Sequence, residues 1–341
     1  MLTSLCGETI ERGRHHIVTV PVARDLGVNI NMTAHVLAGR TDGPTLLILS
    51  MLHGEEWLST LIIREFIRVL DLAKLKGTVI AIPVANESSF NTGTRCVLDN
   101  SDEPDANRSF DGRYNVLTNQ IGRTIEEHFM SKADFLIDYH IGSWGNRMAD
   151  IGYGSDYDDP RLVELSRGMA KAYCFPVLHA MQLNLGTHSK RTSIGCAATK
   201  YGIPGIVPEI GGLGYGQTVE DGWIQENIKG LLGNLGYLGM LDHAPEYCER
   251  YLEIGDYYRI SPKNGGYIEL ALDDASPLTE VRRGQVLARL IDPATFETLE
   301  ELKSPCDGII FYSCRNYMVR PGGWTFGVAD MENGCSRWVS A

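Results

Sequence analysis

The 341-residue chain has 43 acidic residues against 31 lysines and arginines, with 43% hydrophobic and 22% charged residues. This composition is typical of a globular protein with one large domain or two of ordinary size. The net charge of −12 argues against nucleic acid as a partner, because an acidic surface repels phosphate groups, and it disfavours anionic lipid surfaces for the same reason.

The expected location follows from the N-terminus, the apolar runs and the cysteines. The segment from Met1 to His16 has neither an apolar core nor a small-residue cleavage site, so it does not resemble a signal peptide. No apolar run reaches the roughly 18 residues that span a bilayer. The eight cysteines are scattered without a C-x-x-C pair. We therefore expect a cytoplasmic protein with reduced thiols and no membrane contact.

The first part of the chain is predicted to alternate strands and helices. Alternating, β-branched segments indicate antiparallel strands at 17–22 and 29–37, and short apolar runs indicate buried strands at 46–51, 79–84, 135–139 and 203–207. Helical spacing indicates helices at 58–70, 119–130, 161–173 and 223–241. The polar stretch 86–112 is long for a structureless loop, and the segments 142–152 and 215–222 are read as loops without assigned positions.

This alternation predicts an α/β fold, with a mixed, mostly parallel sheet covered by helices on both faces. The pattern changes after about residue 245, where short alternating runs are separated by glycine-containing turns and only residues 295–302 suggest a helix. We therefore expect two domains, an α/β domain over residues 1–245 and an all-β domain over residues 246–341.

Potential catalytic side chains follow three of the predicted strands. His53 and Glu56 form an H-G-E-E motif just after the strand that ends at Met51, His140 follows the strand 135–139, and Glu209 follows the strand 203–207. Ligands of open α/β sheets bind beyond the carboxyl ends of the strands, so we expect these side chains to lie together.

Two histidines and one carboxylate are the protein ligands of many catalytic zinc sites, which keep a position for water. The metal lowers the pKa of that water to about 7 and polarises the carbonyl under attack. A further carboxylate that accepts the water's proton adds roughly 10² to 10⁴ in rate, and Glu209 is the candidate. Each residue alone also fits an ordinary role: His140 as a polar group at a strand end, and Glu209 as a helix N-terminal acid or a salt-bridge partner.

The motifs together resemble those of the succinylglutamate desuccinylase/aspartoacylase family, which is related to the zinc carboxypeptidases. The resemblance covers most of residues 45–215. It rests on the H-G-x-E motif at His53, on Asn86 and Arg95, and on three segments further along the chain. These segments are Asp105-Ala106-Asn107-Arg108, Asp138-Tyr139-His140 and Pro208-Glu209-Ile210-Gly211-Gly212.

The resemblance implies a role for each residue that matches the family motifs. His53, Glu56 and His140 would bind a single zinc ion, and Glu209 would be general base and then general acid. Asp105 would orient a histidine ligand, and Arg95 would stabilise the oxyanion of the tetrahedral intermediate. Asn107 and Arg108 would bind the α-carboxylate of the substrate, a task that suits the planar guanidinium.

The chain also departs from the family pattern. Ala106 replaces the usual leucine and Asp111 the frequent proline, changes that reshape a pocket wall without removing a ligand. Arg191 is a further candidate for substrate binding, with an ordinary surface arginine as the alternative. The C-terminal domain resembles a barrel-sandwich hybrid of the lipoyl and biotinyl type, in which Lys303 lacks the flanking residues of a modified lysine. In this family the equivalent region narrows access to the zinc.

Three functions are compatible with these features. The resemblance favours hydrolysis of the amide bond of a small N-acyl amino acid, such as an N-acetylated diamino acid or an N-succinylated or N-acetylated acidic amino acid. A metallocarboxypeptidase acting on short peptides would share the zinc chemistry. A zinc-binding module without turnover would need neither Glu209 nor Arg95. The acyl group, the amino acid and the oligomeric state are open, and a homo-oligomer is compatible with the sequence.

Overall fold

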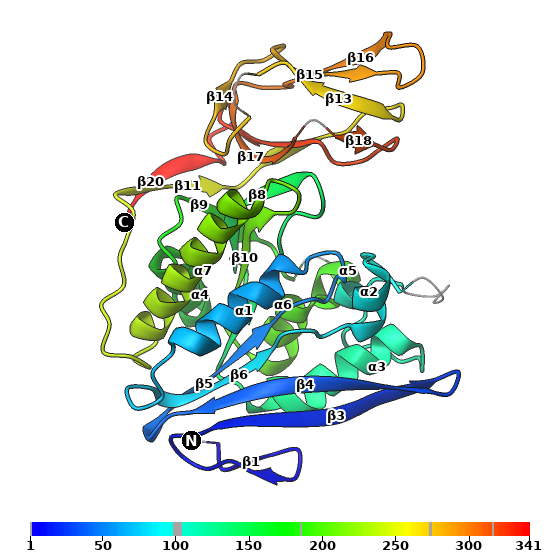
Figure 1. Ribbon diagram of the computed structural model, residues 1–341. Helices are drawn as coiled ribbons and strands as arrows, with labels where there is room; N and C mark the ends of the chain where they lie inside the picture. The colour runs from blue at the N-terminus through cyan, green and yellow to red at the C-terminus, as the bar shows by residue number, and fades with distance from the viewer. Residues whose placement is uncertain (1, 98–103, 185, 273–274, 316) are drawn as a thin grey trace.

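The computed structural model describes residues 2–97, 104–184, 186–272, 275–315 and 317–341. Its main feature is a large mixed sheet (Figure 1). Four neighbouring parallel strands form the centre, in the order β6 (Lys76–Ile82), β5 (Thr41–Leu49), β7 (Phe135–Asp138) and β10 (Gly205–Gly212). Antiparallel strands flank this centre: β4 (Val28–Ala38) and β3 (His15–Asp25) beyond β6, and β8 (Asn146–Gly154) beyond β10. The sheet is therefore mixed, with parallel pairing concentrated in the centre.

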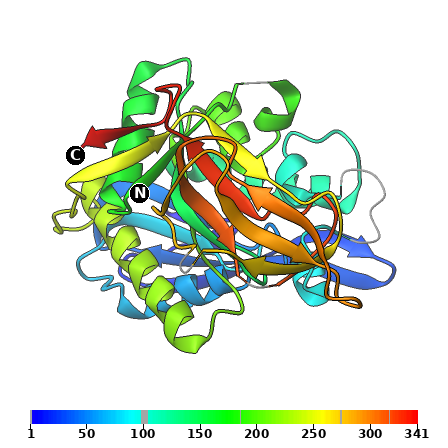
Figure 2. The ribbon, with the colours of Figure 1, turned by 90° about the horizontal axis from the view of Figure 1, so that it is seen from above.

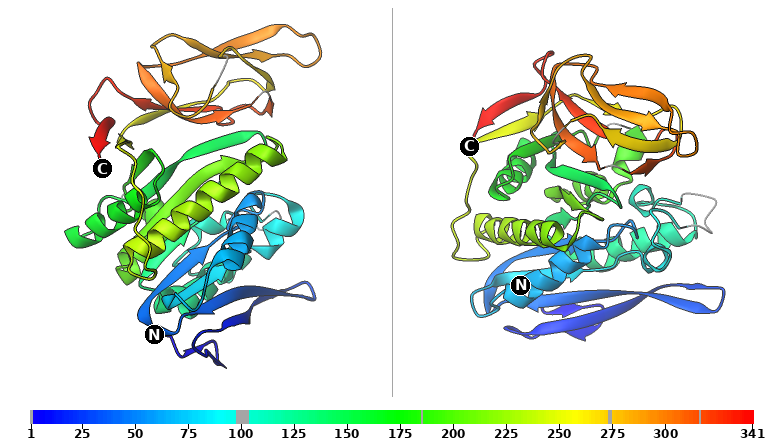
Figure 3. Two further views of the ribbon diagram at one scale, coloured as in Figure 1. Left: turned by 60° about the vertical axis from the view of Figure 1, so that its left-hand side comes forward. Right: turned by 45° about the horizontal axis from the view of Figure 1, so that its top comes forward.

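The central strands are apolar because both faces of the sheet are covered. Along β5, Leu46 and Ile48 belong to one buried cluster, whereas Leu47 and Leu49 belong to another, as the alternation of side chains in a strand requires. One face carries α1 (Leu58–Val69), α4 (Pro160–Ala172) and α7 (Gln217–Tyr237), and the other carries α3 (Leu117–Thr124) and α6 (Ser193–Cys196) (Figures 1 and 3). The predicted covering of both faces is confirmed.

The chain continues the sheet into a second set of strands, here called the C-terminal β unit (β12 to β19, residues 257–330). Strand β17 (Gly308–Cys314) pairs with β8, and β19 (Phe326–Asp330) and β12 (Tyr257–Ile260) follow in order. A separate sheet contains β16 (Thr298–Lys303), β15 (Val286–Ile291), β13 (Gly266–Leu270) and β18 (Met318–Val319). Seen from above, these strands lie over the α/β part (Figure 2), and their apolar side chains enclose a third core cluster.

Two terminal strands attach the end of the chain to the α/β part. Strand β11 (Arg250–Ile254) runs parallel to β9 (Val177–Met181), which pairs with β8, and antiparallel to β20 (Arg337–Ser340). Within β11, the buried carboxylate of Glu253 accepts hydrogen bonds from Arg167 Nε at 2.8 Å and from the Tyr153 hydroxyl at 2.6 Å. This charged contact ties β11 to α4 and β8.

Several predicted elements differ from the observed ones. The suggested helix at 295–302 is wrong: a turn capped by the Asp292 carboxylate, which accepts from the Thr295 amide, leads into strand β16. The segment 142–152, read as a loop, contains most of β8, and 215–222 contains the start of α7. Glu209 lies within β10 rather than after it. No helix in the described part of the chain is long and apolar enough to cross a membrane.

Candidate active site

The H-G-E-E motif lies in the turn between β5 and α1, where the chain leaves the carboxyl end of the central sheet. Met51 has a positive φ of 59°, which bends the chain out of the strand direction. Gly54 follows His53 and packs so closely on α2 (Glu87–Thr92) that a Cβ would lie 2.0 Å from the carbonyl carbon of Ser89. Only glycine fits there, so this contact fixes the turn that positions His53 and Glu56.

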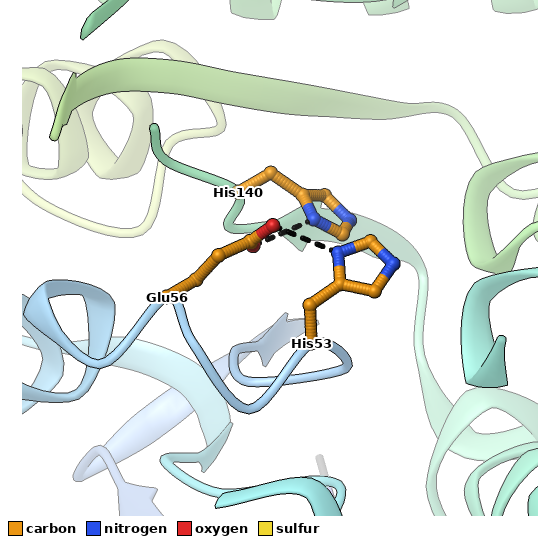
Figure 4. A group of neighbouring side chains, drawn as sticks. All are labelled: His53, Glu56 and His140. Carbon is orange, nitrogen blue, oxygen red and sulfur yellow. Dashed lines mark hydrogen bonds and ion pairs between the residues drawn. The ribbon is translucent and has the colours of Figure 1, made fainter. Parts of the chain in front are cut away.

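The carboxylate of Glu56 lies between the two imidazoles (Figure 4). Its Oε1 is 2.8 Å from Nδ1 of His53, and its Oε2 is 2.9 Å from Nδ1 of His140. All three residues are buried, and one potential ligand atom from each lies within 4.8 Å of the others. His140 arrives from the end of β7, so the structure brings together the three predicted ligands from two different strands.

Each histidine has a carboxylate behind it. Nε2 of His53 is 3.0 Å from Oδ1 of Asp105, and Nε2 of His140 is 3.1 Å from Oδ2 of Asp138. An imidazole whose Nε2–H is held by a carboxylate can bind a metal ion through Nδ1 when the ion replaces the proton that Nδ1 shares with Glu56. Two such nitrogens and one carboxylate oxygen therefore form a donor set that fits a divalent metal ion.

The charges of this cluster are strongly coupled. Burial alone would raise the pKa of Glu56, but the charges of His53 and His140 and their hydrogen bonds outweigh it and lower that pKa well below its usual range. Burial alone would lower the pKa of His140, and the carboxylates of Asp138 and Glu56 raise it instead. The pKa of Asp105 is lowered despite burial, through its hydrogen bond with His53. The cluster thus holds the carboxylates of Glu56 and Asp105 ionised.

Glu209 projects from β10 beside the histidine cluster. Its backbone forms an isolated parallel bridge with His140. Burial raises the pKa of Glu209 to about 8, with His140 opposing the shift and the carboxylates of Asp150 and Glu56 adding to it. Asp150 lies directly opposite Glu209 in the neighbouring strand β8. The Oε2 atom of Glu209 is buried and has no hydrogen-bond partner among the described residues, so it can exchange a proton with a group bound in the cavity.

Two arginines predicted from the sequence lie at the same cavity. Nη2 of Arg95 is 3.3 Å from Oδ2 of Asp105, and its Nη1 is 3.8 Å from Oε1 of Glu56. Arg108 donates through Nε to Nε2 of His188 at 2.7 Å, a contact that the sequence analysis did not foresee. Burial lowers the pKa of Arg108, although a guanidinium remains charged at any ordinary pH.

Asn107 and Arg191 make contacts that differ from a simple substrate-binding position. Oδ1 of Asn107 accepts from the Ser193 amide at 2.9 Å, and its Nδ2 lies 2.9 Å from Nε2 of His140. Because this nitrogen and the Nε2–H that His140 gives to Asp138 are both donors, Asn107 packs against a candidate ligand without a hydrogen bond to it, and it lines the cavity. Nε of Arg191 donates to the carbonyl oxygen of Phe110 at 3.3 Å, and the described cavity lining does not include Arg191. Substrate binding by either residue stays a prediction.

The cavity that contains these groups has a volume of about 470 Å³. The α/β part supplies the polar floor around His53, His140 and Glu209. The C-terminal β unit supplies a further wall, with Arg259 from β12, Tyr312 from β17 and Trp324 from the segment before β19. No recognisable motif predicted these three residues of the wall, which lie fifty or more positions beyond Glu209.

Two polar residues that support the cluster, Asp138 and Ser193, were not predicted from the sequence to have a role. Asp138 precedes His140 by two positions, and the side chain of Ser193 donates to its Oδ2. The signal for Asp138 was present, because a carboxylate two residues before a histidine at a strand end lies on the same side of the chain. No comparable signal marks Ser193, which reaches the cluster from α6.

Comparison with known proteins places this fold and motif set in a family. Residues 42–226 match the model of the succinylglutamate desuccinylase/aspartoacylase catalytic domain. The N-alpha-acetyl-L-2,4-diaminobutyric acid deacetylase of Halomonas elongata is 23% identical over 284 residues, which are 82% of this chain and 80% of that protein.

Solved structures agree with this match over nearly the whole chain. The product-bound ectoine utilization protein EutE (DoeB) from Ruegeria pomeroyi has a TM-score of 0.79 at 20% identity, covering 96% of this chain and 98% of that one. A succinylglutamate desuccinylase/aspartoacylase from Rhodobacter sphaeroides has a TM-score of 0.77 at 20% identity, with the same coverage. The chain therefore belongs to the succinylglutamate desuccinylase/aspartoacylase family.

Proposed function

We propose that this protein is a zinc-dependent hydrolase that cleaves the amide bond of a small N-acyl amino acid. One arrangement carries the proposal. His53 and His140 each turn an Nδ1 atom toward Glu56 while a carboxylate holds their Nε2 atoms, and the unpartnered Oε2 of Glu209 lies beside them. A buried donor set with an adjacent proton acceptor is the combination that metal-assisted hydrolysis needs.

His53, Glu56 and His140 would hold the zinc ion, one per chain. When bound, the ion supplies Lewis-acid polarisation of the scissile carbonyl and lowers the pKa of a water molecule. Glu209 accepts the proton of the attacking water at Oε2 and then donates it to the leaving amine. Its raised pKa of about 8 suits this exchange, because efficient proton transfer needs a pKa near the working pH.

The remaining polar residues bind the substrate and the developing charge. Arg95, anchored by Asp105, would stabilise the oxyanion of the tetrahedral intermediate. Arg108 would bind the α-carboxylate, with Asn107 beside it, because a guanidinium matches the geometry of a carboxylate. Asp105 and Asp138 would fix the orientation of the two histidines.

The substrate class is supported by the cavity and by the relatives. A cavity of about 470 Å³ has the size of a small-molecule site. The Halomonas elongata relative is named as a deacetylase of an N-acetylated diamino acid.

We further propose a division of the chain into two domains at residue 245, with a catalytic domain over residues 1–245. Residues 246–341 would form a domain of the barrel-sandwich type that narrows access, because Arg259, Tyr312 and Trp324 close one side of the cavity.

The test combines metal analysis with a substrate panel. The zinc-loaded protein is expected to release acid from one or more N-acetyl, N-succinyl or N-formyl amino acids. The variant Glu209→Gln should keep its zinc while kcat falls about 10²- to 10⁴-fold, the usual contribution of a general base. Faster release of C-terminal residues from short peptides would instead indicate a carboxypeptidase. Full activity in Glu209→Gln would refute the proposed mechanism.

A further inference from the structure

Two cysteines lie side by side where the chain between α7 and β11 passes the end of α4. Cys174 follows the last turn of α4, and Cys248 belongs to residues 238–249, here called the linker, which Figure 1 shows along one side of the α/β part. Their Sγ atoms are 3.9 Å apart, although 74 positions separate them in the sequence. Among the described residues, no other two cysteines have their sulfur atoms in contact. The fold alone creates this pair, and the proposed mechanism gives it no task.

A hydrogen-bonded frame fixes the backbones of both cysteines. The amide of Cys174 donates to the carbonyl oxygen of Lys171 at 2.9 Å, and the buried Tyr251 hydroxyl donates to the same oxygen at 2.9 Å. The Tyr251 hydroxyl also accepts from the amide of Cys248 at 2.9 Å. The two sulfurs therefore meet because of fixed backbone positions rather than by a chance contact of mobile side chains.

The second half of the linker is held mainly by exposed contacts. Residues 243–249 form no helix or strand, and most of them are exposed. Lys229 of α7 pairs with Glu246 at 2.7 Å, but both side chains are more than half exposed, and exposed ion pairs stabilise a fold only weakly. A covalent bond at Cys248 would therefore fasten a segment that has little else to hold it.

A disulfide between the two cysteines needs only a small movement. A sulfur–sulfur bond is about 2.05 Å long, so the sulfurs, now 3.9 Å apart, must approach each other by about 2 Å. Rotation of the two side chains about their Cα–Cβ bonds can supply this movement without a change in the backbone frame. Both cysteines are partly exposed, so a small oxidant in solution can reach them.

We propose that Cys174 and Cys248 are a site of reversible oxidation, whose disulfide fastens the linker to the end of α4. The oxidant is a small disulfide such as oxidised glutathione. The thiolate of one cysteine attacks a sulfur of this disulfide and releases one glutathione, and the other cysteine attacks the resulting mixed disulfide and releases the second. The two protein thiols lose two protons and two electrons, and the two glutathione thiols that are released gain them.

The disulfide would stabilise the part of the chain that carries Glu209. It would close a loop between residues 74 positions apart, and such a cross-link stabilises a protein chiefly by restricting its unfolded chain. The loop contains β9, β10 and α7, and Glu209 lies in β10. No cysteine is part of the described cavity lining, so the oxidation would leave the side chains of the histidine cluster unchanged.

The surroundings of Cys248 indicate that the oxidation is slow. Burial raises the pKa of Cys248 to about 12, with Cys174 adding to the shift. Its thiol therefore stays protonated at neutral pH, whereas disulfide exchange needs the thiolate. We expect the reaction with oxidised glutathione to take hours, the upper end of the usual range for uncatalysed disulfide exchange.

The experiment incubates the folded protein with oxidised glutathione for several hours and then blocks the remaining thiols with iodoacetamide. Peptide mass spectrometry without reduction is expected to show one cross-linked pair of peptides, which contains Cys174 and Cys248 and separates in dithiothreitol. Thermal melts should show the oxidised protein unfolding about 3–6 °C above the reduced protein, the shift expected for one disulfide in a chain of this length.

Three serine variants identify the cysteines responsible. Cys174→Ser and Cys248→Ser should each lose both the cross-link and the difference between the oxidised and reduced melts. Each variant is compared with its own reduced form, so a general loss of stability does not affect the result. Cys335→Ser is the matched control, because it removes an exposed cysteine between β19 and β20, and it should behave as the wild type.

The results that would overturn the proposal are equally specific. A wild type whose cysteines stay reduced, or carry glutathione without a cross-link, would show that the two thiols only pack against each other. A cross-link through Cys335 or between two molecules would place the oxidation elsewhere, and a Cys174–Cys248 cross-link without a rise in melting temperature would refute the fastening of the linker. None of these measurements depends on bound zinc or on hydrolysis, so they test this site separately from the proposed function.

Discussion

Replacing Asp105 by asparagine tests how the carboxylate behind His53 supports metal binding. Oδ1 of Asp105 accepts from Nε2 of His53 at 3.0 Å and from the Asn107 amide at 2.9 Å, and Oδ2 faces Nη2 of Arg95 at 3.3 Å. Asparagine retains an acceptor for the first two contacts and places an NH₂ group where the second oxygen was. The shape is conserved, and the negative charge that makes the imidazole a better ligand is lost.

The expected loss is about 10- to 100-fold in zinc affinity, the usual cost of removing a hydrogen-bonded group behind a metal-ligating histidine. This corresponds to about 1.4–2.7 kcal/mol of binding free energy. The dissociation constant is measured by competition with a chromophoric chelator at fixed pH. A thermal melt of the metal-free variant checks that the fold is unchanged.

Asp111→Asn is the matched control. Asp111, expected at a pocket wall, is instead an exposed carboxylate that pairs with Lys200 at 3.2 Å and is not part of the described cavity lining. Its positive φ of 53° suits asparagine, which tolerates that conformation. The control should bind zinc as the wild type does. If Asp105→Asn binds zinc as tightly as the control, the contact between Asp105 and His53 does not tune the site and the reasoning is wrong.

Three further predictions concern the turn, the oxyanion and the link to β11. Gly54→Ala places a Cβ 2.0 Å from the Ser89 backbone and should cost about 1–3 kcal/mol of stability, measured by denaturant unfolding, together with loss of bound zinc. Arg95→Ala should lower kcat about 10²- to 10³-fold with a smaller change in KM, as measured by steady-state kinetics. If the oxyanion role is wrong, the loss will instead appear as a rise in KM with little change in kcat. Burial alone would raise the pKa of Glu253, but its contacts with Arg167 and its other partners lower it. The ionised carboxylate therefore stabilises the folded protein above about pH 4.3, and this stabilisation is lost as the pH falls through the folded-state pKa. Glu253→Gln should therefore cost about 2 kcal/mol at neutral pH, and thermal melts should show the deficit shrinking in acid; a deficit that is constant with pH would exclude the ionic explanation.

The sequence predicted the central sheet and the histidine cluster for a common reason. Apolar runs such as the one in β5 are buried on both faces, and parallel strands end at the same edge of a sheet. His53 and His140 each follow such a run, so their proximity in space could be inferred without coordinates. Glu209 was placed correctly at this edge, although it lies inside β10 and not beyond its end.

Other features depend on contacts that no local pattern records. Strand β8 begins with the polar and charged residues Asn146 and Arg147 and contains glycines, so its sequence has no clear alternation. It nevertheless pairs with β10 along one edge, and with β17 and β9 at the two ends of its other edge. The aromatic wall of Tyr312 and Trp324 reaches the cavity only because β17 pairs with β8. Such long-range pairings decide which distant residues meet, and they lie beyond reasoning from one segment at a time.

The zinc content of the purified protein is the direct test of the metal site formed by His53, Glu56 and His140. Elemental analysis of the wild type and of His53→Ala is combined with the rate of acyl release before and after treatment with a chelator. We expect about one zinc per chain in the wild type, its loss in the variant, and activity that disappears with the chelator and returns with zinc. A wild-type protein that carries no metal and cannot be loaded with any would contradict the site of His53, Glu56 and His140 and the mechanism built on it.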